Sequence, residues 1–115
     1  MKKIYKILSL RIDITSITSI DNKIIYNNLD YFIKINDQDH RIFSLREHEK
    51  YEEYLALDNK HFELQFKRAK TESDYELMKI YLKMMWEIKK PIFEMVQLEV
   101  EKLINYWAVY NGGIE

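Results

Sequence analysis

The hydrophobic pattern of this chain changes near residue 44, and that change constrains the fold more than any other feature. Before residue 44, Ile, Tyr, Thr and Asn dominate, and apolar side chains recur at every second position. After it, Glu, Lys, Leu and Met dominate, and apolar side chains recur every three to four residues. The first period is that of a strand and the second that of a helix. We therefore expect a single α+β domain, mainly β over residues 1–43 and mainly α over residues 44–111.

Four stretches before residue 44 have the pattern of strands. The first covers residues 8–14, and its phase slips at 15–16, where we expect a bulge or bend. The others cover residues 23–26, 31–35 and 41–43, with a four-residue hairpin loop at 36–39 before the last. The sequence thus predicts an antiparallel meander of three or four strands. The basic start of the chain has its apolar stretch broken by Lys6, Ser9 and Arg11, which favours a strand over a targeting segment.

Two capping boxes predict where the helices begin. Residues 44–47 (Ser-Leu-Arg-Glu) predict that one helix starts near Leu45. Residues 73–76 (Ser-Asp-Tyr-Glu) predict that a second helix starts at that second box. Residues 61–70 fit both periods, but their Glu, Leu, Gln, Lys and Ala favour helix. The second helix either kinks at Pro91 or gives way to a new one, and Asn111 with two glycines ends it. The strands should therefore pack on a helical hairpin or a long kinked helix.

The scarcity of glycine and the lack of cysteine exclude several kinds of active site. The two glycines are residues 112 and 113, so a phosphate-binding loop, a dinucleotide fingerprint and a nucleophile elbow are absent. Without cysteine there is no disulfide, thiol nucleophile or thiolate ligand. His48 and Glu52 have a helical metal-ligand spacing, which is more typical of a solvated helix face. We expect no enzyme, cofactor or metal, and a site assembled by the fold around His40 or His61 stays open.

The aromatic and methionine side chains of residues 74–110 form the candidate binding surface. A helix that packs on one side needs an apolar stripe only ~100° wide, and here apolar side chains point in more directions. Either the helix is central and covered on two sides, or one face binds a protein, because Trp, Tyr and Met are enriched at interfaces. The candidate interface residues are Trp86, Phe93, Tyr106, Trp107 and Tyr110, together with the acidic Glu49, Glu52 and Glu53.

A basic segment provides a second hypothesis, a small nucleic-acid-binding regulator. Its cations are Lys60, Lys67, Arg68 and Lys70. Phe62 and Phe66 lie among them and could stack on bases. The formal net charge of −1 argues against a tight nucleic-acid binder. A polar helix face with both rings in the core is the reading that we favour for this segment.

The expected function is therefore protein binding without catalysis. Abundant Ile, Lys and Tyr, with scarce Ala, Gly, Pro and Arg, indicate an AT-rich bacterial, phage or plasmid genome. We expect a cytoplasmic phage or mobile-element factor that inhibits or sequesters a host complex, such as an anti-CRISPR protein, another anti-defence inhibitor or a toxin-immunity protein. A homodimer that buries Trp86, Phe93 or Trp107 is also expected. No apolar run approaches the ~20 residues of a membrane span, so we expect no membrane partner.

Overall fold

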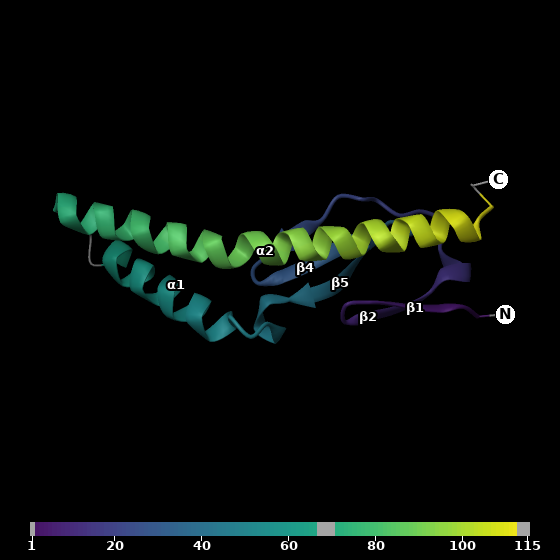
Figure 1. The fold of residues 1–115 in the computed structure, drawn as a ribbon, viewed down its shortest axis with the longest axis horizontal. Helices are drawn as coiled ribbons and strands as arrows, with labels where there is room; N and C mark the ends of the chain where they lie inside the picture. Colours follow the sequence, from purple (N-terminus) through teal and green to yellow (C-terminus); the bar gives the residue numbers. More distant parts are fainter. Residues whose placement is uncertain (1, 67–70, 113–115) are drawn as a thin grey trace. The chain divides into compact units, whose positions relative to one another are not determined.

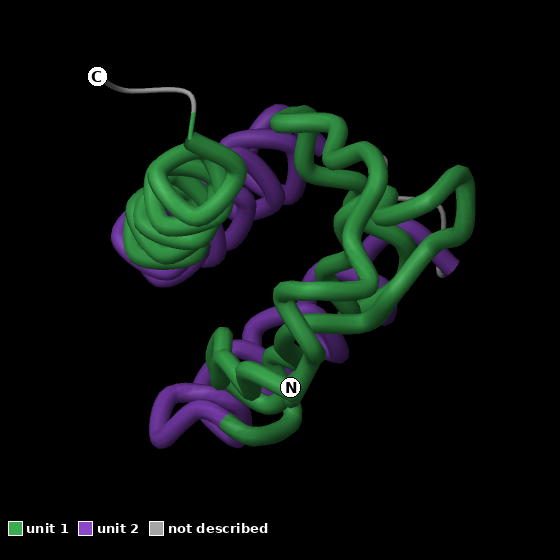
Figure 2. Tube along the Cα trace, turned by 90° about the vertical axis from the view of Figure 1, so that its right-hand side faces the viewer, with its two compact units in different colours: residues 1–47, 94–115 green, residues 48–93 purple. Residues whose placement is uncertain are grey.

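The computed structural model describes residues 2–66 and 71–112, and within them the fold is α+β (Figure 1). The chain forms two compact units, coloured separately in Figure 2. Residues 1–47 and 94–115 make up the strand unit, and residues 48–93 make up the hairpin unit. The long helix α2 contributes to both. The prediction of a single domain stays a prediction.

The described part of the strand unit contains five strands in two antiparallel sheets, rather than three or four strands in one meander. One sheet is the hairpin of β1 (Ile4–Ile7) and β2 (Leu10–Asp13). The other has the order β3 (Ile25–Asn27), β4 (Asp30–Ile35) and β5 (Gln38–Ser44). The first hairpin is attached to β5 through Ser9, whose N–H and Oγ donate to the Ile42 carbonyl at 3.0 and 2.8 Å.

Two predicted boundaries in the strand region are wrong, and in both places residues with positive φ form the turn. Leu8 has a φ of 54°, so the predicted strand over 8–14 is instead a turn followed by β2. Asn36 and Asp37 have φ values of 53° and 62°, and the ladder resumes at Gln38. The hairpin loop is therefore two residues long instead of four. The paired positive φ angles of Asn36 and Asp37 match the twist of the flanking strands. A period-two pattern carries no information on positive φ angles at either turn.

The core of the strand unit lies between β4 and the C-terminal part of α2, which spans Glu72–Tyr110. The predicted strand over residues 31–35 is confirmed, and Tyr31, Ile33 and Ile35 alternate along it and are almost completely buried. From α2, the buried side chains are Val96, Val100 and Leu103. Their spacing of four and three places them on one helix face. Each such side chain contributes roughly 1.5–3 kcal/mol when it is fully buried.

A capped turn and one asparagine shape the loop between β2 and β3. The 3-10 helix η1 covers Ile14–Ser16, and the Asp13 carboxylate accepts hydrogen bonds from the Thr15 N–H and hydroxyl at 3.0 and 2.7 Å. The hydrogen bond from the Thr15 hydroxyl, together with a hydrogen bond from the Lys3 N–H, holds the pKa of Asp13 below its ordinary value. From the β4–β5 turn, the Asn36 side chain bonds to residues 16, 18 and 19.

The helices do not begin at the predicted capping boxes. Residues 45–47 form only the 3-10 helix η2 (Leu45–Glu47), and α1 covers Tyr51–Phe66. The His48 ring explains the late start, since its Nδ1 accepts the Lys50 N–H at 3.0 Å. At α2, the Thr71 hydroxyl accepts the Asp74 N–H at 3.1 Å, so the cap is Thr71 rather than Ser73.

The described part of the ambiguous segment, residues 61–66, is helical, as the composition favours; residues 67–70 lie outside the described residues. The helix assignment of α2 continues through Pro91, so a new helix at that residue is wrong. The predicted end near residue 111 is confirmed. Gly112 has the left-handed φ of 71° that is typical of a helix C-terminus.

Candidate protein-binding surface

Within the hairpin unit, α2 exposes apolar side chains on both sides of its buried line. Met85 and Ile92 mark the buried line, with exposed fractions of 7% and 3%. The Trp86 stripe, defined as Tyr75, Leu82, Trp86 and Phe93, has spacings of seven and four residues. At ~100° per residue, its members lie within about 40° of one another around the helix. All four are 39–59% exposed.

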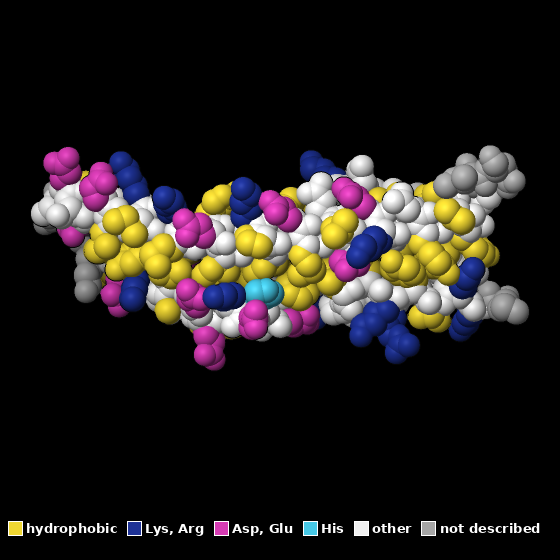
Figure 3. Space-filling model, viewed as in Figure 1, with side chains coloured by type: hydrophobic (Ala, Val, Ile, Leu, Met, Phe, Trp, Pro, Cys, Tyr) yellow, Lys and Arg dark blue, Asp and Glu magenta, His cyan; other side chains and the backbone are white. Residues whose placement is uncertain are grey.

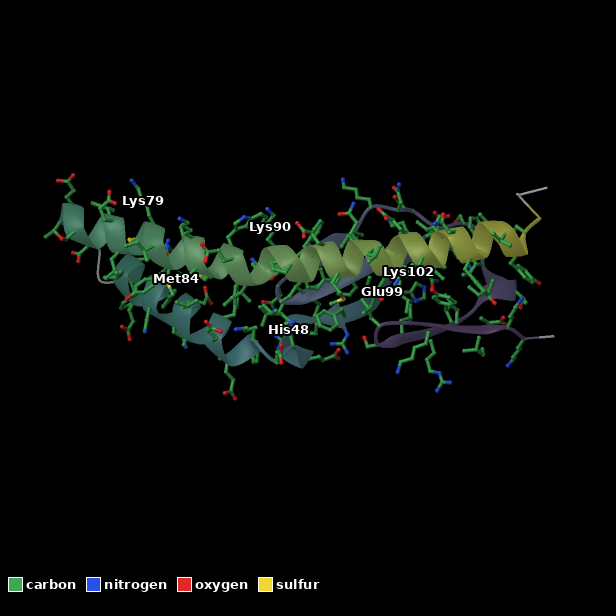
Figure 4. All side chains as sticks on the ribbon, in the orientation of Figure 1. His48, Lys79, Met84, Lys90, Glu99 and Lys102 are labelled. Carbon is green, nitrogen blue, oxygen red and sulfur yellow. The ribbon has the colours of Figure 1, made fainter. Side chains whose placement is uncertain are left out.

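A second stripe lies on the opposite side of the same helix segment. The Met84 stripe is defined as Leu77, Ile80 and Met84, which are 37–51% exposed. In Figure 3, hydrophobic side chains gather over the N-terminal part of α2, and Figure 4 labels Met84 in the same view. The charged residues Lys79, Lys83 and Glu87 occupy the helix face between the two stripes. This segment of α2 is therefore apolar around more than half of its circumference, although only its buried line is needed for packing inside the unit.

Helix α1 carries a third exposed stripe. The Phe62 stripe is defined as Leu55, Phe62 and Phe66, again spaced by seven and four residues, and 37–76% exposed. The Phe62 and Phe66 rings stack at 6.0 Å between centroids, with 22° between their planes. The expectation that these two rings lie in the core is wrong. The buried positions of α1 are instead taken by Tyr54 and Leu57.

Two contacts show that α1 and the first half of α2 run antiparallel as a hairpin. The Lys89 ammonium lies 5.4 Å from the centre of the Tyr54 ring, and the Lys60 ammonium lies 6.0 Å from that of Tyr81. The residue numbers in each pair add up to nearly the same value, as they must when one helix runs back along the other. Cation–ring contacts of this kind contribute about 0.5–1 kcal/mol at exposed sites.

The predicted interface residues divide between the two units. Trp86 and Phe93 belong to the hairpin unit, whereas Tyr106, Trp107 and Tyr110 belong to the strand unit. Trp107 is half-buried, and its Nε1 donates to the Ile17 carbonyl at 3.2 Å, which gives it a role inside its own unit. Tyr106 and Tyr110 remain 38% and 44% exposed.

A small aromatic cluster surrounds Tyr106 in the strand unit. Its ring lies 5.0 Å from that of Tyr5, between centroids, and the Lys3 ammonium lies 5.4 Å from the Tyr106 ring and 5.5 Å from the Tyr110 ring. Burial, with smaller contributions from Glu99 and Tyr106, raises the pKa of Tyr5 above its ordinary value. The cluster ties the end of α2 to β1.

The acidic candidates lie within the described residues, whereas the basic segment does so only in part. Glu49, Glu52 and Glu53 are all exposed at the start of the hairpin unit, and Glu53 pairs with Lys50 at 3.3 Å. Of the basic candidates, Lys60 contacts Tyr81, while Lys67, Arg68 and Lys70 lie outside the described residues. In the sequence, the exposed Phe62 and Phe66 lie between Lys60 and Lys67 of the basic segment.

The described residues were expected to hold no metal site, and their remaining features are two histidines and a pocket. Among the described residues, no three His, Asp or Glu side chains are close enough to hold a metal ion, and His40 and His61 are half-buried. The strand unit has an open pocket of about 460 Å³, lined in part by Asp21, Lys34 and Asp37. No helix in the described ranges has the length and hydropathy needed to cross a membrane. Comparison with protein-family models, curated proteins and solved structures finds no match.

Sequence reasoning identified Trp86 and Phe93 but missed most of the exposed apolar side chains. Leu77, Ile80 and Leu82 are not among the predicted interface residues, because residue type alone favours the aromatic side chains. The spacing of seven and four residues, applied to every apolar residue, would have found the stripes. It could not have separated exposed stripes from the buried line, since both have the same period.

Proposed function

We propose that this chain is a non-enzymatic protein-binding protein that docks on a macromolecular partner through the Met84 stripe. The observation that supports the proposal is that α2 exposes apolar side chains beyond those that its own unit covers. Contiguous exposed apolar surface is typical of interaction sites. Met84 adds adaptability, because its unbranched, polarisable side chain fits irregular partner surfaces.

The biological form that best suits these features is a cytoplasmic inhibitor encoded by a phage or mobile element. It would occlude or sequester a host complex, as an anti-CRISPR protein or another anti-defence inhibitor does, or block a toxin as an immunity protein does. The exposed Glu49, Glu52 and Glu53 favour a partner with a basic surface, because complementary charge speeds association and disfavours wrong partners. Nucleic-acid-processing complexes carry such surfaces.

The test compares two substitutions on the same turns of α2. A tagged wild-type chain is expressed in a bacterial host with an AT-rich genome, and the partner that it captures is purified. The Kd of the complex between this partner and each variant is then measured. Met84→Glu should raise that Kd at least tenfold, because a charge replaces a desolvated apolar contact. Lys83→Glu, on the charged face between the stripes, should change it less than threefold at physiological salt. Equal effects of the two substitutions would refute docking through the Met84 stripe.

The exposed Phe62 and Phe66 pair keeps nucleic-acid binding as the second candidate function. Two stacked, solvent-facing rings that lie in sequence between the cations of a basic segment are suited to single-stranded bases. Electrophoretic mobility shift with a single-stranded oligonucleotide, repeated over a salt series, separates the two functions. A submicromolar shift that weakens steeply with salt and is lost in Phe62→Ala would favour nucleic acid. No shift at 50 mM salt would favour the protein partner.

A further inference from the structure

We propose that the Phe62 stripe of one copy packs on the Trp86 stripe of a second copy, so that two hairpin units form a four-helix bundle. The proposal rests on the proposed protein-binding function. It assigns an occupant to the exposed apolar stripes that the macromolecular partner does not contact. A second copy of this chain is the proposed occupant for three reasons. The two stripes lie on the same side of the hairpin, their exposed area is close to that of a dimer interface, and the charges at their outer edges have opposite signs.

The two stripes face the same side of the hairpin. On α1, the buried line is formed by Tyr54 and Leu57. The Phe62 stripe lies about 130° beyond this line in the direction of increasing residue number, at ~100° per residue. On α2, the Trp86 stripe lies about 90° beyond its buried line in the same sense. Because the helices are antiparallel and their buried lines face each other, these rotations bring both stripes to one side. The Met84 stripe, rotated the other way, faces the opposite side and remains accessible in the dimer.

The exposed area is sufficient for a stable dimer. The seven side chains of the two stripes expose on average about half of their surface. With ~200 Å² for a large side chain, this corresponds to about 700 Å² per copy. Standard protein interfaces bury about 800 Å² per partner. The two stripes together therefore nearly supply a complete interface, and charged residues at their edges would add the rest.

The charges at the outer edges of the two stripes have opposite signs. Around α1, Glu52 and Glu63 lie on the edge of the Phe62 stripe that is turned away from α2. Around α2, Lys79 and Lys90 border the Trp86 stripe on the edge turned away from α1, with Lys83 between them. All of these side chains are solvent-exposed. When α1 packs on the partner's α2, the acidic edge meets the basic edge.

The observed hairpin register also aligns the individual charges. Tyr54 contacts Lys89 and Lys60 contacts Tyr81, so a residue of α1 is level with the residue of α2 whose number is about 142 minus its own. A two-fold axis parallel to the helices keeps this level between copies. The pairs that it places side by side are Glu63 with Lys79, Glu52 with Lys90, Leu55 with Trp86 and Phe66 with Tyr75.

The competing dimer, with a two-fold axis across the helices, is disfavoured by the same charges. It would place α1 on the partner's α1 and α2 on the partner's α2. The glutamates would then face glutamates and the lysines would face lysines, which is destabilising. Charge thus selects the arrangement in which α1 packs on the partner's α2.

Matched substitutions on α2 test the interface by sedimentation equilibrium of the full chain. Wild-type protein should be a dimer at micromolar concentration. Leu82→Ala should raise the dimer Kd at least tenfold, and Trp86→Ala at least about 30-fold. Ile80→Ala should leave it within threefold, because Ile80 is as exposed as Leu82 (51% and 49%) but lies on the other side of the helix. A monomeric wild-type chain at 100 µM, or equal effects of the Leu82 and Ile80 substitutions, would overturn the proposal.

Charge reversal tests which helices meet. The double variant Glu52→Lys/Glu63→Lys should weaken the dimer at least tenfold, and adding Lys79→Glu/Lys90→Glu should restore it to within about threefold of wild type. In the competing dimer, the first pair of substitutions replaces acid–acid by base–base contacts and would leave the Kd nearly unchanged; that outcome refutes the α1–α2 arrangement.

The dimer and the proposed partner docking can fail separately. Leu82→Ala should give monomers that still bind the partner, whereas Met84→Glu should give dimers that do not. Because the chain has no cysteine, the Glu63→Cys/Lys79→Cys variant provides a direct check. Mild oxidation should convert it to covalent dimers, while either single substitution should remain largely monomeric on a non-reducing gel. Equal cross-linking of the single and double variants would contradict the pairing.

Discussion

Replacing Asn36 with glycine should destabilise the strand unit by about 2 kcal/mol, because its side chain holds the segment before β3. Its Oδ1 accepts from the Thr18 N–H at 2.7 Å, the Thr18 hydroxyl at 2.8 Å and the Ser19 N–H at 3.1 Å. Its Nδ2 donates to the Ser16 carbonyl at 3.0 Å. All four bonds are exposed, so each is assigned the low end of the usual range, ~0.5 kcal/mol.

Glycine is the informative replacement because it tolerates the φ of 53° that residue 36 adopts. The Asn36→Gly change therefore removes the side-chain bonds without straining the turn. Asn36→Ala removes the same bonds and adds the cost of a left-handed residue with a Cβ, which is roughly 1 kcal/mol. The expected order of stability is wild type, then the glycine variant, then the alanine variant, in steps of about 2 and 1 kcal/mol.

Urea unfolding monitored by tryptophan fluorescence measures these differences. In a Trp86→Phe background, Trp107 reports the strand unit, and its indole already donates to the Ile17 carbonyl beside the bonded segment. With m near 1–2 kcal/mol/M for a small unit, the glycine variant should lose about 1–2 M in midpoint. Asn28→Gly is the matched control, since Asn28 has a similar φ of 61° in the β3–β4 turn. Within the described residues, no hydrogen bond of the Asn28 side chain is found, so this change should shift the midpoint by less than 0.3 M, with m near 1–2 kcal/mol/M.

An unchanged midpoint for Asn36→Gly would refute the reasoning, and so would an Asn28→Gly change of equal size. In the first case, water would replace the four bonds without loss. In the second case, the cost would come from the greater flexibility of glycine in the unfolded chain and not from the side-chain bonds.

Three further outcomes are expected. Thr71→Ala should lower the helicity and the stability of the hairpin unit by about 1 kcal/mol in urea unfolding, whereas Ser73→Ala should change little. Leu103→Ala should cost about 2–5 kcal/mol because the side chain is fully buried, and Leu98→Ala, 52% exposed, should cost less than ~1 kcal/mol. Hydrogen bonds lower the pKa of Asp13 in the folded state, so its ionised carboxylate contributes to the stability of the fold above ~pH 4. This contribution is lost as the pH falls through the lowered pKa. Asp13→Asn should therefore flatten the acid limb of a curve of unfolding free energy against pH.

Strongly periodic segments could be predicted from the sequence, and boundaries that depend on a few atoms could not. The alternation of Tyr31, Ile33 and Ile35 predicted a strand over residues 31–35, and β4 lies there. The capping box at residues 44–47 predicted a helix start, yet the structure has a 3-10 turn there, and α1 follows after the His48 ring has taken the Lys50 N–H. A local motif competes with neighbouring side chains for the same backbone groups, and the sequence does not state which of them wins.

The sequence by itself determined the α+β class, because the hydrophobic period is a property of each local segment. It also determined that glycine-dependent phosphate sites are absent, because no glycine precedes residue 112. Only the tertiary structure decided which apolar stripes are covered. Met85 and Trp86 are adjacent, yet one is 7% and the other 59% exposed, and that difference arises from the antiparallel packing of α1 against one line of α2. Burial is a property of contacts between distant segments, so the candidate surface became visible only in the folded chain.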